Sequence, residues 1–203
     1  MTAGAELGFG TTASWWNAGD MTDVDLNDGW VGGARVRLGQ SHTLDVGVVG
    51  AVGPQSTFLA GPELKWEFAR LARGDIAHSP AFHAAWINGL AIGASDDYDP
   101  SGDEPERDIF LAPYTGVLGS GGIRSAQMFV GFRFAASERF FNQENDLTLY
   151  PILAFGFLLH PSPSWSFFVE ADLAGGLTVT DFGDSALIVY PSAGFSFNFD
   201  VPR

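Results

Sequence analysis

A run of oxygen-bearing side chains between residues 97 and 108 has the spacing of a calcium-binding loop. In such a loop, positions 1, 3, 5 and 12 supply side-chain oxygens, position 7 supplies a backbone carbonyl, and a glycine at position 6 permits the sharp turn. Gly102 falls at position 6 when the count begins at Asp97. The expected Ca²⁺ ligands are Asp97, Asp99, Ser101, Asp103 and Asp108. Pro100, Glu104 and Asp108 depart from the usual loop, and extracellular sites of this kind bind Ca²⁺ weakly.

Acidic residues gather in the segments that we expect to join strands at one end of the molecule. Sixteen acids and two arginines lie in these segments, and their net charge of −14 equals that of the whole 203-residue chain. A rim this acidic attracts divalent cations or a basic protein partner, or it simply solvates that end of the molecule. It cannot neutralise phosphates, so nucleic acid is excluded as a partner. The acids are Asp20, Asp23, Asp25, Asp28, Asp96, Asp97, Asp99, Asp103, Glu104, Glu106, Asp108, Glu138, Glu144, Asp146, Asp181 and Asp184.

Residues that could carry catalysis are sparse. The chain contains no cysteine, so it has neither a thiol nucleophile nor a disulfide framework. Its four histidines, His42, His78, His83 and His160, are expected at the end opposite the acidic rim, away from the acids with which they could share a proton. Their spacing includes no i, i+2 or i, i+4 pair that would indicate a metal site. We therefore predict that the protein is not an enzyme.

Alternating apolar and small or polar residues define the elements that position these groups. Apolar residues at every second position, as in Leu44, Val46 and Val48, predict strands with one uncharged face. Nine segments show this pattern, and none has a charged residue on its apolar face, where Asn88 is a polar exception. Lipid imposes that requirement on the outside of a membrane barrel. The segments are 5–15, 30–38, 44–52, 58–68, 82–92, 128–134, 147–157, 165–177 and 187–199.

A tenth segment, Ile109–Val117, alternates poorly because both of its faces carry apolar residues. Its proline supports a strand, because alternate strands share a proline at the same outward height: Pro62, Pro113, Pro151 and Pro191. Proline removes a ladder hydrogen bond, so we expect a bulge or a local twist at each. Counting this segment gives about ten strands, with both termini at one end; eight or nine is the alternative.

The C-terminal octapeptide resembles the assembly signal of bacterial outer-membrane β-barrels. Ser192, Gly194, Phe197 and Phe199 hold the polar, glycine and aromatic positions of that signal. An ordinary half-buried strand of a water-soluble sandwich is the alternative interpretation. The resemblance implies an all-β fold, a transmembrane up-and-down antiparallel β-barrel, in a single domain over 1–203. It also implies the bacterial outer membrane, with lipid and lipopolysaccharide as surroundings and both termini in the periplasm.

Charges with inward parity form a second group on the first four strands: Glu6, Arg35, Arg37, Asp45, Glu63, Lys65 and Glu67. Opposite signs on neighbouring strands can pair across the ladder and close a narrow lumen. Inward glycines such as Gly47 and Gly131 leave room instead. We predict a non-enzymatic outer-membrane barrel, a structural or interaction element whose acidic outer loops contact Ca²⁺ or other divalent ions, lipopolysaccharide or a protein. The alternative is a small, porin-like, cation-preferring diffusion pore.

Overall fold

The computed structural model describes residues 2–11, 13–16, 24–25, 30–39, 43–52, 58–72, 81–97, 106–123, 125–139, 147–162, 164–178 and 185–200. Side chains are described over 36, 43–52, 58–71, 81–94, 109–123, 125–136, 147, 149–162, 164–175 and 193–195. The strands are β1 (Thr2–Thr11), β2 (Ala13–Trp16), β3 (Val24–Asp25), β4 (Trp30–Gly39), β5 (Leu44–Val52), β6 (Phe58–Ala72), β7 (Ala81–Asp97), β8 (Glu106–Ile123), β9 (Ala126–Arg139), β10 (Leu147–Ser162), β11 (Trp165–Thr178) and β12 (Ser185–Asp200).

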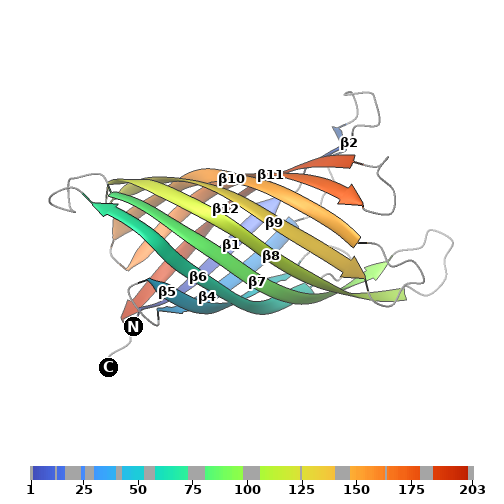
Figure 1. Ribbon diagram of the computed structural model, residues 1–203, viewed down its shortest axis with the longest axis horizontal. Coiled ribbons are helices and arrows are strands. Elements are labelled where there is room, and N and C mark those ends of the chain that lie inside the picture. The colour runs from blue at the N-terminus through green and yellow to red at the C-terminus, as the bar shows by residue number, and fades with distance from the viewer. Residues whose placement is uncertain are drawn as a thin grey trace.

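Ten of the described strands follow one another around a closed ring (Figure 1). β1 pairs with β4, each later strand pairs antiparallel with the next, and β12 pairs back with β1. Short β2 continues the line of β1 along β12 and pairs with β3. Thr2 pairs with Asp200, so the first and last strands meet at one end, here named the terminal end; the other is the far end. The expected up-and-down antiparallel barrel of about ten strands is confirmed.

The poorly alternating segment 109–117 is part of β8, which pairs with β7 without interruption from Ala81↔Gly122 to Asp97↔Glu106. Its second apolar face packs over glycines of the neighbouring strands. A Cβ on Gly93 would overlap the Phe110 ring, and one on Gly131 would lie 3.0 Å from Leu118 Cδ1. These inward apolar side chains cover bare backbone in the wall, which explains why alternation alone describes this strand poorly.

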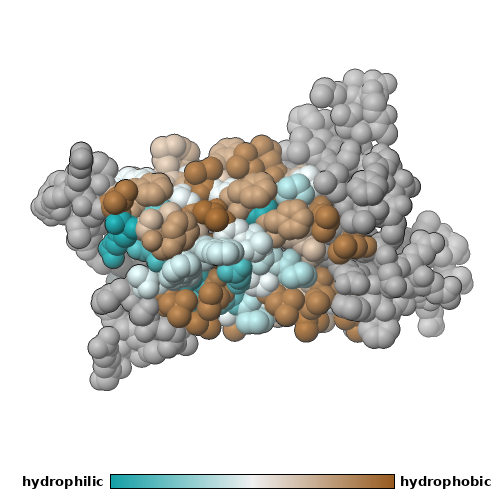
Figure 2. All heavy atoms as spheres, in the orientation of Figure 1, coloured by the Kyte–Doolittle hydropathy of each residue, from teal (hydrophilic) through white to brown (hydrophobic). Residues whose placement is uncertain are grey.

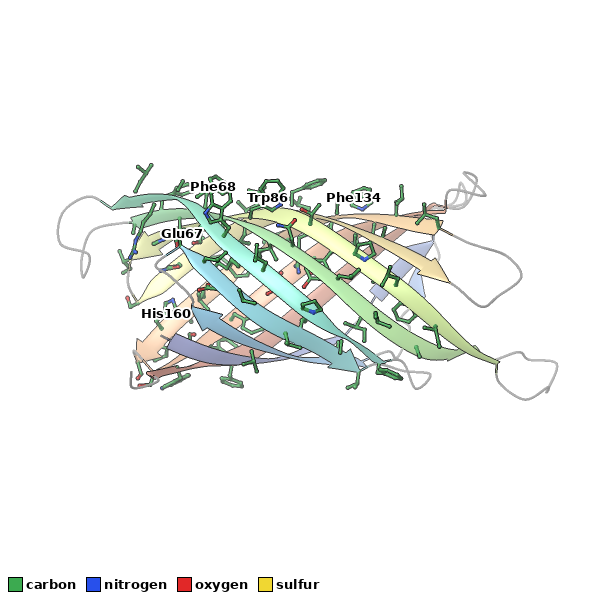
Figure 3. All side chains as sticks on the ribbon, turned by 60° about the horizontal axis from the view of Figure 1, so that its bottom comes forward. Glu67, Phe68, Trp86, Phe134 and His160 are labelled. Carbon is green, nitrogen blue, oxygen red and sulfur yellow. The ribbon has the colours of Figure 1, made fainter. Side chains whose placement is uncertain are left out.

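Large apolar side chains cover the outside of the barrel, at the positions that the alternation predicts. Val48, Ile92 and Phe132 are each more than half exposed. Phe68, Trp86 and Phe134 stand on the outside of the wall, whereas Glu67 and His160 lie within it (Figure 3). Hydrophobic residues dominate the described part of the visible surface, with a paler area near its middle (Figure 2). No helix long and apolar enough to cross a membrane occurs among the described residues.

Burial in this molecule is reversed relative to a water-soluble domain. Ala91, Ala154 and Ala174 are at most 2 % exposed, and the polar Glu63 and Ser166 are equally buried. Within the described part of the chain, no large side chain is fully buried. The most buried positions are therefore held by small and polar groups, and most of the large exposed side chains on the outside of the barrel are apolar.

The expected bulges at the prolines are absent; each proline interrupts one ladder without changing its register. Pairing of β6 with β7 stops at Ala60↔Ile92 and resumes in phase at Glu63↔Gly89, on either side of Pro62. Pro113 and Pro151 produce the same gap toward β9 and β11, and the break between β1 and β2 lies opposite Pro191. The ladder on the other side of each proline stays paired, as in Val48↔Pro62. That intact ladder holds the chain extended, so a missing N–H costs hydrogen bonding on one side only.

True register shifts occur elsewhere, near the terminal end. One falls between Glu67 and Ala69 in the β6–β7 ladder, and the other between Leu159 and Ser162 in the β10–β11 ladder. The first changes which residues of β6 face outward, because Leu71, opposite Phe82, is 70 % exposed. Arg70 then stands opposite His83. The register shift thus adds one residue to β6, and as a result Leu71, rather than Arg70, shares the outward face with Phe82.

Candidate functional site in the barrel lumen

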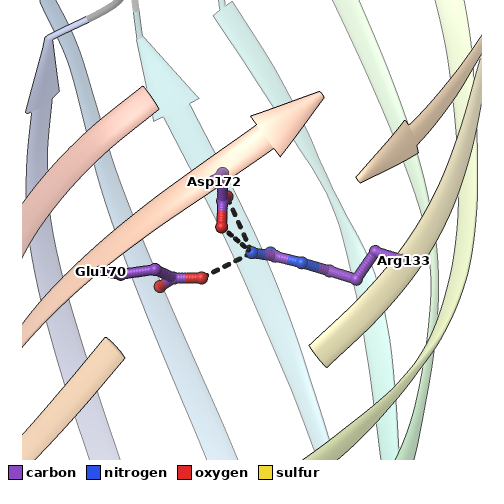
Figure 4. Close-up of polar contacts among 3 residues, drawn as sticks. All are labelled: Arg133, Glu170 and Asp172. Carbon is purple, nitrogen blue, oxygen red and sulfur yellow. Dashed lines mark hydrogen bonds and ion pairs between the residues drawn. The ribbon is translucent and has the colours of Figure 1, made fainter. Parts of the chain in front are cut away.

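A cluster of three charged side chains joins β9 to β11 inside the barrel (Figure 4). Arg133 Nη2 donates to Glu170 Oε1 at 2.6 Å and to Asp172 Oδ2 and Oδ1 at 2.8 and 3.0 Å. The three side chains are 19 to 27 % exposed, so the contacts are partly shielded from water. Charge-assisted hydrogen bonds of this length are about twice as strong as neutral ones. The cluster carries one positive and two negative charges, a net charge of −1.

Small residues on β10 allow Arg133 to reach past that strand. In the β10–β11 ladder, Ala154 stands opposite Asp172 and Gly156 opposite Glu170. Ala154 is 1 % exposed, and a Cβ on Gly156 would lie 2.7 Å from Phe129 Cζ, so side chains of β9 cover this stretch of β10. A larger residue at either position would occupy the space that those side chains cross. The sequence of β10 is therefore part of the site, because its small residues leave the space that the side chains of β9 cross.

Tyr114 repeats this arrangement between β8 and β6. Its hydroxyl donates to Glu63 Oε2 at 2.8 Å, and β7 lies between the two strands. Gly89 of β7 faces Glu63 on one side and Tyr114 on the other, and a Cβ there would overlap the phenol ring. Glu63 is 2 % exposed, so this hydrogen bond satisfies a buried oxygen. The absence of a side chain at Gly89 thus allows Tyr114 of β8 to cross β7 and bind Glu63 of β6.

Nearer the terminal end, ionisable side chains lie close to one another on adjacent strands. His83 Nδ1 lies 3.4 Å from Glu67 Oε1, and Lys65 Nζ lies 4.0 Å from Asp45 Oδ2. Asp45, Lys65 and Glu67 belong to the inward group expected from the sequence. Glu6 stands opposite Arg35 in the β1–β4 ladder, and Arg37 opposite Gly4, but the side chains of these charged residues lie outside the described ones.

A cavity of about 230 Å³ lies between these groups. Its lining includes Lys65, Gln127, Phe129, Arg133, Phe168 and Glu170. It mixes aromatic surface with charged and amide groups, and it is large enough to hold water molecules. The described lumen is therefore neither filled by apolar packing nor uniformly polar.

The stretch expected to bind Ca²⁺ lies at the far end and largely outside the described residues. Asp97 ends β7 and Asp108 lies near the start of β8, where the ladder pairs Asp97 with Glu106 and Ser95 with Asp108. Asp99, Ser101 and Asp103 lie outside the described residues, as do the side chains of Asp97 and Asp108. Several acids expected in loops lie instead in strands: Asp25, Asp96, Asp97, Glu106, Asp108 and Glu138. Among described side chains, no group of three histidines or acids is placed to hold a metal ion.

The histidines that can be placed lie at the terminal end, as predicted. His83 is near the start of β7, and His160 is near the end of β10. His42 and His78 lie outside the described residues. His83 contacts an acid of the barrel interior, Glu67, rather than an acid of the far rim.

The alternation in segments 128–134 and 165–177 gives Arg133, Glu170 and Asp172 inward parity, but it does not predict that their side chains contact one another. It also missed the pair formed by Tyr114 and Glu63. The usable signal is a long polar residue and an acid of the same parity on strands two apart, with glycine or alanine of that parity on the strand between. Gly89 and Ala154 satisfy that rule in these two cases.

No protein-family model matches the chain, and no curated protein matches its sequence. Among solved structures, the outer membrane protease OmpT from Escherichia coli is similar with a TM-score of 0.50 and 10 % identity, covering 98 % of this chain and 97 % of that one. The chain has an outer-membrane β-barrel fold. Ail of Yersinia pestis is 12 % identical, covering 98 % of both chains, with a TM-score of 0.36. The N-terminal β-barrel domain of Pseudomonas aeruginosa OprF is 12 % identical, covering 96 % of this chain and 97 % of that one, with a TM-score of 0.38. At 10 % identity, the similarity to OmpT shows the fold alone.

Proposed function

We propose that the chain is a bacterial outer-membrane β-barrel that acts without catalysis, as a structural or interaction element of the envelope. The pairing of its inward ionisable groups carries this proposal. Arg133 holds two carboxylates of β11, Tyr114 holds Glu63, and Lys65 lies beside Asp45. Contacts of this kind join different strands inside the barrel and stabilise its wall. In the outer membrane, the terminal end of the barrel is expected to face the periplasm, and the acidic far end is expected to face the outside of the cell.

A cation-preferring pore is the second candidate, favoured by the sign of the described inward charges. Among the described side chains, five inward acids outnumber three inward bases: the acids are Asp45, Glu63, Glu67, Glu170 and Asp172, and the bases are Lys65, Arg70 and Arg133. An excess of negative charge in a narrow lumen raises the local concentration of cations.

Planar-bilayer recording separates the two candidates. The structural proposal expects no steady single-channel steps from the unmodified protein, because paired side chains narrow the lumen. An Arg133→Ala, Glu170→Ala, Asp172→Ala variant removes three of those side chains and is expected to conduct more readily. Steady, cation-selective steps from the unmodified protein would favour the pore and contradict the closed wall.

At the far end we propose a weak Ca²⁺ site formed by Asp97, Asp99, Ser101, Asp103 and Asp108. Binding on the order of 0.1 to 1 mM is typical of extracellular calcium sites, and a bound cation would relieve repulsion among the acids. Calorimetry should give heat with the wild type and much less with an Asp97→Asn, Asp99→Asn variant, which leaves most of the rim charge in place. Equal heats would indicate diffuse attraction. The same rim would then be left to contact lipopolysaccharide or a basic protein.

A further inference from the structure

A polar cluster interrupts the apolar outer face in the middle of β7 and β8. Trp86 Nε1 donates to Thr115 Oγ1 at 2.7 Å, and Thr115 Oγ1 donates to Asn88 Oδ1 at 2.8 Å. Asn88 and Thr115 face each other directly in the β7–β8 ladder. The chain Trp86→Thr115→Asn88 therefore satisfies the indole N–H, the hydroxyl and one lone pair of the amide oxygen.

The amide nitrogen of Asn88 takes no part in this set of hydrogen bonds. Among the described residues, the contact with Thr115 is the only hydrogen bond recorded for this side chain, and it uses the oxygen. The amide nitrogen therefore presents two N–H groups without an acceptor, and the oxygen keeps a second lone pair. An unsatisfied polar group in hydrocarbon costs several kcal/mol, and acyl chains offer no acceptor.

Apolar side chains surround this cluster on the outer surface. Leu64 stands opposite Asn88 on β6 and is 39 % exposed, and Leu90 and Val117 are 41 % and 49 % exposed. Trp86 itself is 44 % exposed. If the outer face lies in lipid, as the proposed function holds, the position of Asn88 midway along β7 puts it among acyl chains, where another protein can supply the acceptor.

We propose that this face, defined by Leu64, Trp86, Asn88, Leu90, Thr115 and Val117, binds a second copy of the chain within the membrane. A carboxamide is self-complementary: the nitrogen of one Asn88 donates to the oxygen of the other, and the reverse bond forms about the same two-fold axis. Each amide oxygen then accepts one bond from Thr115 and one from the second copy. The patch contains no formal charge, so two copies meet there without like-charge repulsion.

The test compares the wild type with Asn88→Leu, which keeps a similar volume and removes both amide groups. Association is measured in detergent micelles by sedimentation equilibrium, on protein first shown to migrate as a folded, boiling-sensitive band. We expect the association constant to fall about tenfold, which is equivalent to about 1.4 kcal/mol, because the two hydrogen bonds between the Asn88 amides are lost. A wild type that is folded but monomeric, or equal association of the two proteins, would overturn the proposal and leave the barrel function intact. A chain that needs no detergent would instead refute the membrane function itself.

Cysteine chemistry provides a second measurement that does not alter Asn88. Because the chain has no cysteine, Leu90→Cys and Val169→Cys each introduce a single thiol. Leu90 lies beside Asn88, whereas Val169 is 47 % exposed on β11, four strands around the ring. A short bis-maleimide should cross-link Leu90→Cys in lipid vesicles and leave Val169→Cys monomeric. Equal cross-linking of the two variants would overturn the proposed interface.

Discussion

At the scale of single residues, the barrel interior depends on long polar side chains that find partners beyond the adjacent strand. Arg133 is the clearest case, because one guanidinium nitrogen contacts carboxylates of both Glu170 and Asp172. The two acids belong to one strand and are two residues apart, so their charges repel without a cation between them. Arginine suits this role because its charge is permanent and its planar group donates in several directions.

Replacing Arg133 by Met should destabilise the folded barrel by about 1 to 3 kcal/mol, because two partly buried carboxylates lose their counter-ion. The loss is smaller than for a fully buried pair, since water reaches these side chains. Urea unfolding in lipid vesicles measures the change.

The control combines Arg133→Met with Glu170→Gln and Asp172→Asn. These amides keep the shape of the acids and remove the repulsion, so most of the lost stability should return. If the single variant and the triple variant unfold at the same urea concentration, the electrostatic role of Arg133 is wrong.

At the scale of elements, glycine and alanine decide which strands can be bridged. Tyr114 passes over Gly89 to reach Glu63, and Phe129 covers Gly156. In each case an aromatic side chain from one strand lies against bare backbone of the next. The glycines that leave room in the wall are thus partly covered, and the lumen is narrower than a count of inward glycines suggests.

Gly89→Ala should destabilise the barrel by about 1 to 3 kcal/mol, because the added methyl overlaps the Tyr114 ring and displaces its hydrogen bond to Glu63. Thermal unfolding in detergent measures it. Gly50→Ala is the matched control, since its nearest neighbour would be Leu59 O at an ordinary 3.7 Å.

A double-mutant cycle makes the assignment specific. In a Tyr114→Ala background the overlap is gone, so Gly89→Ala should cost much less there. An equal cost in both backgrounds would place the defect in the backbone of β7 rather than in the Tyr114 contact.

The strands and their faces could be predicted from the sequence because alternation has a strict period of two and lipid forbids charge on one face. That period located β4 to β7 and β9 to β12 and placed Val48 and Phe132 outward. The alternation is weak in β8, because Phe110 and Leu118 are apolar but face inward, where they cover glycines of neighbouring strands. Alternation could not predict the contact of Arg133 with Glu170 and Asp172. That contact crosses β10 and depends on the small residues Ala154 and Gly156, which are distant from Arg133 in the sequence.

At the scale of the whole molecule, the ring places apolar bulk outside and paired polar groups inside. Phe132 and Val130 on β9 are each 56 % exposed, beside the inward Arg133. A closed ring has no unpaired edge, so every strand can meet its backbone hydrogen bonds without water. The proline gaps do not open the ring, because the register continues across each of them.

Phe132→Arg should destabilise the barrel in vesicles by about 2 to 4 kcal/mol, the cost of arginine near the bilayer midplane. Ile123→Arg, at the terminal end of β8, should cost about 0 to 1 kcal/mol, because that position lies near the interface. Urea unfolding compares the two variants. Similar small costs for both would mean that the apolar belt does not lie in lipid.

Gel electrophoresis with and without boiling, after folding in detergent micelles, tests the central claim most directly. A closed barrel resists the denaturing detergent of the gel until it is heated. We therefore expect a compact, faster-migrating band from the unheated sample and a single unfolded band after boiling. Protein that is soluble and monomeric in plain buffer, with no change of mobility on boiling, would contradict the account.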